Sequence, residues 1–409
     1  MHIVAMMCLT VFSNYEGGMI MRKIQIAFFA ACIALPCFFW SNESDAMPVF
    51  ARKYGTSCST CHIGYPARNA FGEAFRNNGY RWPGGQDEDK VKIEQSPLGS
   101  EAWKGVWPSA IFPADIPGVF PAAVFMKGTL LEYRADDKKY RWGLDGDIEI
   151  LFAATVGDHI SIIGDWAVNS GDAPAFQLLY ALDEGVILGF GDVGITKLFT
   201  IISASSNGNG NSYAVKLPSP GKALELRIAG GEKKGGYSLI AGVGQGETEW
   251  STEPFDSRYV RATYKICGAG LLSGAGCEMG NDMIGMDNAI TIGANYFNSH
   301  EGVDGVENAY GGDITATYGS FRAIGQIGRL IETDVTQYSG ELDYFFYPWL
   351  VGVVRYENWD VTSDERTYTS ALIPGFAAFL RANAKLGSEF VIGNGEDDNT
   401  LKVFAQLAF

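Results

Sequence analysis

From about residue 122 to the end of the chain, apolar and polar residues alternate one by one in segment after segment, separated by Gly, Asn and Asp. A period of two is the period of a β-strand, in which successive side chains point to opposite faces. The clearest examples are residues 144–152, 224–228, 260–266, 291–296, 313–318 and 341–346. The pattern predicts an all-β fold for this part of the chain.

The length of the alternating region favours a transmembrane β-barrel. Roughly 290 residues of such strands are too many for the single core of a soluble sandwich. In a transmembrane barrel the apolar face meets lipid, the polar face lines a wet lumen, and each strand needs about 9–11 residues. At roughly 18 residues per strand and turn, the region holds about 16 antiparallel strands. A periplasmic all-β domain is the alternative.

Both ends of the chain carry features of export to the bacterial outer membrane. Arg22 and Lys23 precede the apolar residues 24–40, and a small-residue site at Ala46 follows, which is the pattern of a secretory signal. We therefore expect a leader and signal peptide over residues 1–46, with a signal-anchor helix as the alternative. The alternation over residues 401–409 ends on Phe409, which resembles the closing strand of outer-membrane barrels.

Two further segments lie between the signal and the barrel. Residues 47–96 are polar and charged, with Phe71 and Phe75 at helical spacing and a helix stop at residues 78–79, so we expect a small α-helical domain. Residues 97–121 contain five prolines and two tryptophans, which is typical of an extended connector. The barrel then occupies residues 122–409.

The small domain contains the motif Cys58-Ser-Thr-Cys61-His62. Two thiols one helical turn apart can both add to the vinyl groups of a haem, while the imidazole of the next residue binds the iron. A zinc site would need further Cys or His nearby, and after the signal the chain has only His159 and His300 besides His62. A redox dithiol would sit on a thioredoxin-like βαβ pattern, which is missing. The motif predicts one covalently bound haem c.

The residues around the motif supply candidates for the rest of the haem site. A small domain buries a haem poorly by packing alone, and the expected apolar wall consists of Phe50, Tyr54, Phe71, Phe75 and Tyr80. The haem propionates can pair with arginines, or these can be ordinary solvated side chains: Arg52, Arg68 and Arg76. For the sixth iron ligand we name Met126; the other candidates are Met47, His159, His300 and water.

Cys267 and Cys277 flank a Gly-rich loop, which predicts a disulfide in an exported protein, with two free thiols as the alternative. The net charge of −16 argues against nucleic acid as a partner and fits cations or basic proteins.

The N-terminal part resembles a known family over residues 47–52, 58–62, 69–72 and 75–80. It is similar to the N-terminal cytochrome of fused monohaem cytochrome c-porin proteins, which include outer-membrane iron oxidases. The resemblance implies that the haem domain plugs the barrel and passes electrons from an extracellular donor, Fe(II), to periplasmic c-type cytochromes. It leaves open whether the chain is an oxidising enzyme or an electron carrier. Electron export and a passive porin with a haem-bearing plug remain alternatives.

No iron site is carried over from that family. The acidic residues of the first strands, Asp145, Asp147 and Glu149, are equally explained as polar lining of the lumen.

Overall fold

The structure is a computed structural model. It describes residues 48–65, 67–84, 87–92, 95–97, 115–117, 121–134, 138–169, 173–192, 217–218, 220–245, 255–273, 286–303, 306–358, 369–381, 383–394 and 399–409. The predicted signal segment, Met47 and Cys277 lie outside these residues. Cys267 is exposed near the end of a strand. Because its predicted partner Cys277 is not among the described residues, the predicted disulfide is not tested.

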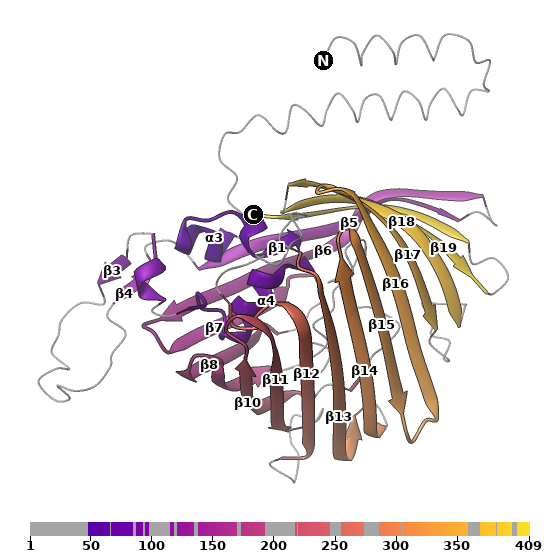
Figure 1. Cartoon of the computed structure of the whole chain (residues 1–409). Helices are drawn as coiled ribbons and strands as arrows, with labels where there is room; N and C mark the ends of the chain where they lie inside the picture. The colour runs from indigo at the N-terminus through magenta and orange to yellow at the C-terminus, as the bar shows by residue number, and fades with distance from the viewer. Residues whose placement is uncertain are drawn as a thin grey trace, which may run out of the picture. The chain divides into compact units, whose positions relative to one another are not determined.

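Among the described residues, sixteen strands form one closed antiparallel barrel, which confirms the predicted barrel and its strand number. Figure 1 shows these strands side by side. They are β5 (Ala122–Arg134), β6 (Lys139–Val156), β7 (Ile160–Ala167), β8 (Ala175–Asp183), β9 (Val186–Asp192), β10 (Lys222–Gly230), β11 (Lys234–Gly244), β12 (Ser257–Ala269), β13 (Ala289–Val303), β14 (Val306–Tyr318), β15 (Phe321–Leu330), β16 (Val335–Tyr347), β17 (Leu350–Asn358), β18 (Ser370–Arg381), β19 (Ala384–Gly393) and β20 (Thr400–Ala408).

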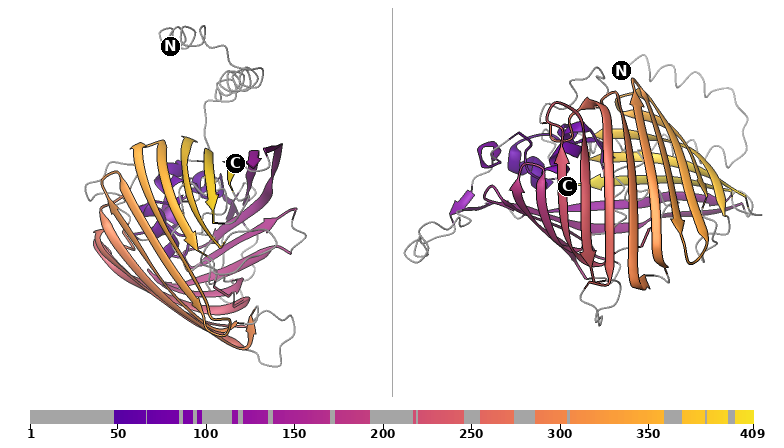
Figure 2. Two further views of the ribbon diagram at one scale, coloured as in Figure 1. Left: turned by 90° about the vertical axis from the view of Figure 1, so that its right-hand side faces the viewer. Right: turned by 60° about the horizontal axis from the view of Figure 1, so that its bottom comes forward.

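The barrel closes between its first and last strands. β20 pairs with β5 from Thr400 opposite Arg134 to Ala408 opposite Phe125, so the ring leaves no open sheet edge. We call the end at which β5 begins and β20 ends the near end, and the opposite end the far end. Connections at the near end are mostly short, such as residues 348–349, whereas residues 193–221 form a long connection at the far end. Figure 2 shows the strands running between these two ends.

The two faces of the barrel differ in polarity in the predicted sense. On β12, Arg261, Thr263 and Lys265 are buried on the inner face, whereas Tyr264 and Ile266 are exposed on the outer face. The same alternation recurs along the other long strands, whose outer faces carry most of the large exposed apolar side chains. A soluble protein would bury such side chains, so this outer face is suited to lipid.

Buried ion pairs connect strands along the inner wall, either directly adjacent strands or strands on the two sides of a third. Arg261 on β12 and Asp313 on β14 approach to 2.6 Å, with both side chains almost completely buried. Arg322 pairs in the same way with Asp343, also at 2.6 Å. In each pair the two opposite charges neutralise one another inside the barrel. An isolated buried charge would be strongly unfavourable.

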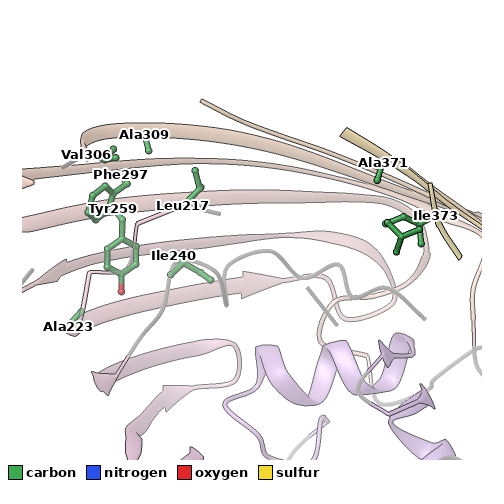
Figure 3. Close-up of a cluster of buried hydrophobic side chains, with 10 residues drawn as sticks. Leu217, Ala223, Ile240, Tyr259, Phe297, Val306, Ala309, Ala371 and Ile373 are labelled. Carbon is green, nitrogen blue, oxygen red and sulfur yellow. The ribbon is translucent and has the colours of Figure 1, made fainter. Parts of the chain in front are cut away.

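An apolar cluster lines the inner wall toward the far end of the barrel. Figure 3 shows its members from widely separated strands, including Tyr259, Phe297 and Ile373. Leu217, which precedes β10, packs into the same cluster and is buried. Leu217 therefore lies against the inner wall.

The N-terminal part forms short elements rather than an extended helical domain. They are α3 (Pro48–Tyr54), the 3₁₀ turn η1 (Cys58–Thr60), β1 (His62–Gly64), β2 (Ala67–Arg68), α4 (Ala70–Asn77), the 3₁₀ turn η2 (Glu88–Lys90), β3 (Gln95–Pro97) and β4 (Asp115–Pro117). The helix predicted around Phe71 and Phe75 is confirmed as α4. β3 pairs with β4, so the described ends of the predicted connector lie side by side. None of the helices in the described ranges is long and apolar enough to cross a membrane.

Residues 48–92, which we call the inner segment, pack against three separate arcs of the barrel wall. Val49 joins an apolar cluster with Phe125 on β5. Ile63 packs with Val351 on β17 and its neighbours on β16 and β18, and Tyr80 packs against a cluster on β8 and β9. These wall residues lie toward the near end of their strands and on different sides of the ring. The inner segment therefore spans the lumen at the near end.

Candidate functional site

The Cys-x-x-Cys-His motif forms one tight turn on the inner segment. η1 begins at Cys58, and the Cys61 backbone N–H donates to the Cys58 carbonyl over 3.0 Å, so the two cysteines stand one turn apart. Cys58, Cys61 and His62 all line one cavity of about 270 Å³ that opens to solvent. The structure thus brings the three predicted site residues to one shared cavity.

Asn69 ties this turn to the start of α4. Its backbone N–H donates to the Cys61 carbonyl over 3.0 Å, and its side-chain amide donates to the Ser59 carbonyl over 2.9 Å. Its side-chain oxygen accepts from the Gly72 N–H over 2.9 Å, which caps the helix. A Cβ at Gly72 would lie only 2.1 Å from the Cys61 oxygen. Glycine at this position therefore lets the helix press directly against the cysteine turn.

Aromatic side chains of the inner segment form one side of the cavity. Four of the five predicted wall residues line it: Phe50, Tyr54, Phe75 and Tyr80. Phe71 instead packs behind them against Trp82, with 5.0 Å between ring centroids. Trp82 itself lines the cavity, and sequence reasoning missed it although it follows Tyr80 by only two positions.

The barrel supplies the opposite side of the cavity, which no motif predicted. Its apolar part comes from inward side chains of β6 and β7, including Leu151, Ala153 and Ile163. Its polar part comes from Asp165, Gln177 and Asp192 on β7, β8 and β9. These residues are 90 or more positions away from the cysteines in the sequence, and only the seating of the inner segment in the barrel brings them together.

One of the three predicted arginines reaches the cavity. Arg68 lines it and is held by Glu73, with 2.7 Å between Arg68 Nε and a Glu73 carboxylate oxygen. Arg52 instead donates to the Ala122 carbonyl on β5 over 2.8 Å, and Arg76 is not among the described lining residues. Of the three, Arg68 is the one placed to pair with an anionic group in the cavity.

The structure does not bring Met126 to the cavity. Met126 follows the inward Phe125 on β5, so the strand alternation turns it to the outer side, where it lies with Ile148 and Leu407 in a separate small pocket. His159 contacts the Ala181 carbonyl near the β6–β7 turn, and His300 lies near the far end of β13. Within the described residues, the ring next to His62 is instead that of Tyr65, 5.2 Å away between centroids.

Burial governs the protonation of the groups around the turn. It raises the pKa of the Cys61 thiol to about 12, with the neighbouring Cys58 adding to the effect. Burial, followed by the negative charges of Glu149 and Asp165, also raises the pKa of Tyr65. Both side chains therefore stay protonated near neutral pH.

A buried polar network fixes the cavity wall to the barrel. Lys53 Nζ donates to one oxygen of Asp87 over 2.5 Å, and the Tyr54 hydroxyl donates to the other over 2.6 Å. Lys53 also donates to the hydroxyl of Thr155 on β6. Burial by itself would raise the pKa of Asp87, but the Lys53 ammonium and the hydrogen bonds lower it below its usual range. The network thus holds Tyr54 in the cavity wall.

No protein-family model and no curated protein matches the chain. Among solved structures, a porin refined at 1.8 Å resolution is 13% identical, with 70% of this chain and 99% of that chain covered and a TM-score of 0.44. The solved neighbours are porins. A mutant of Rh. blastica porin has 12% identity, the same coverage and a TM-score of 0.45. A triple mutant of Rhodopseudomonas blastica porin has 12% identity, the same coverage and a TM-score of 0.43. The barrel assignment itself rests on the strand pairing of this chain.

Proposed function

We propose that this protein is an electron-transfer protein of the bacterial outer membrane, a monohaem cytochrome c fused to a porin-like barrel. It carries one haem c on residues 47–96 and moves electrons between an extracellular donor, Fe(II), and periplasmic c-type cytochromes. The observation that carries the proposal is the convergence of Cys58, Cys61 and His62 on one cavity between the inner segment and the barrel wall.

The residues of the cavity fit a covalently held haem. Two thiols one turn apart can form the two thioether bonds, and His62 can bind the iron. The aromatic wall excludes water from one side, and Arg68 can pair with a propionate. When bound, the haem supplies a centre that takes up and releases one electron.

The barrel supports a place in the outer membrane. Its apolar outer face is suited to lipid, and its closure leaves no backbone edge unpaired in hydrocarbon. Barrels of this class have short turns on the periplasmic side and longer loops outside. By that rule the near end, with the inner segment, faces the periplasm, where soluble cytochromes can reach it. The cleaved signal peptide over residues 1–46 is part of the same proposal.

The direct test is to mix the purified, oxidised protein with Fe(II) at near-neutral pH. We expect the absorption spectrum of a reduced c-type haem to develop within seconds. A variant with Cys58→Ala and Cys61→Ala should contain no covalent haem and serves as the control. If the wild-type protein attaches haem but Fe(II) does not reduce it, the iron-oxidising version of the proposal is wrong.

The passive porin remains the second candidate, because the porin-like barrel by itself suits it. The contacts of the inner segment with three arcs of the wall favour a closed lumen. Ion conductance of the protein in a planar lipid bilayer separates the two functions. A large, haem-independent conductance would favour the porin. Electron export, the remaining alternative, is tested separately: the reduced protein would then reduce an external acceptor.

A further inference from the structure

A second cavity, of about 120 Å³, lies between the inner segment and the strands β11 to β15 of the barrel wall. One face of α4 lines it with Ala70, Glu73 and Asn77. Hydroxyl groups on four adjacent strands line the wall side, and we call these four residues the hydroxyl stripe: Ser238, Thr263, Thr291 and Thr315. The strand pairing sets Ser238 opposite Thr263 and Thr291 opposite Thr315, so the stripe runs along the inner face.

Thr263 is the residue that points to a ligand. It is only 6% exposed, yet its hydroxyl makes no hydrogen bond with any residue that the structure describes. The hydroxyl of Thr315 is also buried, and it too makes no hydrogen bond within the described part of the chain. Buried hydroxyls are normally hydrogen-bonded, because losing water without a replacement partner costs free energy. Each hydroxyl has one proton to donate, so two unused donors line the same small cavity.

The charged residues of the lining favour an anion. Three cations and two carboxylates line the cavity: Arg68, Lys265, Arg322, Glu73 and Asp287. Both carboxylates are already held by cations of the lining, at 2.7 Å by Arg68 and at 2.9 Å by Lys265. Arg322 is paired with Asp343, which is not among the described lining residues. The lining thus has three positive charges against two negative ones, and its unused hydroxyl donors suit a ligand that accepts hydrogen bonds.

The volume of the cavity restricts the ligand to a small one. It is less than half that of the cavity at the cysteine turn, about 120 Å³ against about 270 Å³. A cavity admits a water molecule once its volume exceeds about 10–15 Å³. The second cavity therefore has room for a small ion with part of its water shell.

We infer that this cavity binds a small inorganic anion of the size of chloride, through the hydroxyls of Thr263 and Thr315. The anion connects the barrel to the inner segment, because the hydroxyl stripe belongs to the wall whereas Arg68 and α4 belong to the segment. The apolar contacts of the segment lie on other arcs of the ring, so the anion adds a contact on the side of β11 to β15. The site involves neither Cys58 nor His62 and is therefore independent of the proposed haem.

The test uses chloride itself as the probe, because its nuclear magnetic resonance line broadens when the ion exchanges with a protein site. The full-length protein in detergent is titrated with sodium chloride, and the haem-free Cys58→Ala/Cys61→Ala variant should broaden the line equally. The double variant T263V/T315V keeps the shape of both side chains but loses both hydroxyls, and it should bind about tenfold or more weakly. T263S/T315S keeps the hydroxyls and should retain binding. S161A is the matched control, since Ser161 also has a buried hydroxyl without a hydrogen bond among the described residues, but lies outside this cavity.

A second measurement tests whether the anion holds the inner segment. Limited proteolysis within residues 48–92 is compared in sodium chloride and in sodium gluconate of equal concentration, since gluconate is a larger, organic anion. A ligand that binds only the seated segment lowers its open population by the factor 1 + [L]/Kd, so cleavage should be about tenfold slower when chloride is at about ten times its Kd. In T263V/T315V the two salts should give equal rates.

The outcomes decide between an anion site and a cavity that contains only water. Absence of line broadening, or equal broadening by the wild type and T263V/T315V, overturns the site. Broadening that is lost in T263V/T315V and kept in T263S/T315S and S161A supports it. If binding follows this pattern but chloride leaves the cleavage rate of the wild type unchanged, the connection between wall and segment is overturned and the anion site alone is supported. None of these results depends on whether the protein carries haem.

Discussion

Lys53 and Asp87 form an ion pair of 2.5 Å in which both side chains are almost completely buried. The same ammonium reaches Thr155 on β6, and the same carboxylate accepts from Tyr54 and from the backbone N–H of Trp82. One pair of charges thus connects the barrel wall to two residues that line the cavity. The pair thus adds a polar contact to the apolar contacts that hold the inner segment against the barrel wall.

Replacing Asp87 with Asn should loosen the inner segment. The substitution leaves the Lys53 ammonium buried without its counter-charge, and breaking a buried pair in this way costs roughly 3–5 kcal/mol. Limited proteolysis of the folded protein should therefore cleave within residues 48–92 much faster than in the wild type. D89N is the control, because Asp89 is exposed in the same part of the chain. Equal cleavage of the D87N variant and the wild type would contradict the role of the pair.

The pair should also give the inner segment a defined response to acid. The pKa of Asp87 is lowered in the folded protein, relative to about 3.9 for an unperturbed Asp. A carboxylate with a lowered pKa contributes stability above its unfolded pKa and loses it as the pH falls through the folded value. Protection of the segment's backbone amides from hydrogen–deuterium exchange, corrected for the pH dependence of the intrinsic exchange rate, should persist from neutral pH to about pH 4 and decline below it. In the D87N variant this decline should be absent.

Replacing Gly72 with Ala should impair attachment of the proposed haem. The added Cβ would stand 2.1 Å from the Cys61 oxygen, so α4 must shift away from the cysteine turn, at a cost of about 1–3 kcal/mol. The haem content per protein, measured by the pyridine haemochrome spectrum, should fall. Gly340→Ala is the matched control, because a Cβ there meets nothing closer than 3.9 Å. Full haem content in the Gly72 variant would refute this packing argument.

Replacing Gly293 with Ala should destabilise the barrel. Gly293 on β13 lies between Arg261 and Asp313, and a Cβ would stand 2.5 Å from an Arg261 nitrogen and 2.6 Å from an Asp313 oxygen. The buried ion pair must then separate, so the temperature at which the barrel unfolds, measured by heat-dependent gel mobility, should fall. Gly312→Ala should have little effect, since its Cβ would keep 3.6 Å from the nearest atom. An unchanged unfolding temperature for the Gly293 variant would be the contrary result.

The strands and their faces were predictable because they depend on local alternation. Tyr264 and Lys265 are adjacent in sequence and lie on opposite faces of β12, as a period of two requires. The helix around Phe71 and Phe75 was predictable for a related reason, since helical spacing and the Asn78-Gly79 stop are also local.

The cavity was predictable only in part. Cys58, Cys61 and His62 are recognisable because attachment of a haem needs these residues at this spacing. Met126 was a reasonable candidate by residue type, but the phase of β5 places Phe125 inward and Met126 outward. That phase cannot be read from a single methionine. Trp82 was missed because its neighbours show no periodic pattern.

By itself, the sequence determined the strand type, the polarity of the two barrel faces and the presence of the cysteine turn, since each follows from residues within a few positions of one another. Only the tertiary structure decided what faces that turn. Closure of the barrel and seating of the inner segment place Asp165, Gln177 and Asp192 in the cavity that contains His62. Contacts between residues more than 100 positions apart depend on how apolar surfaces such as those of Ile63 and Val351 fit together, and no local pattern encodes that fit.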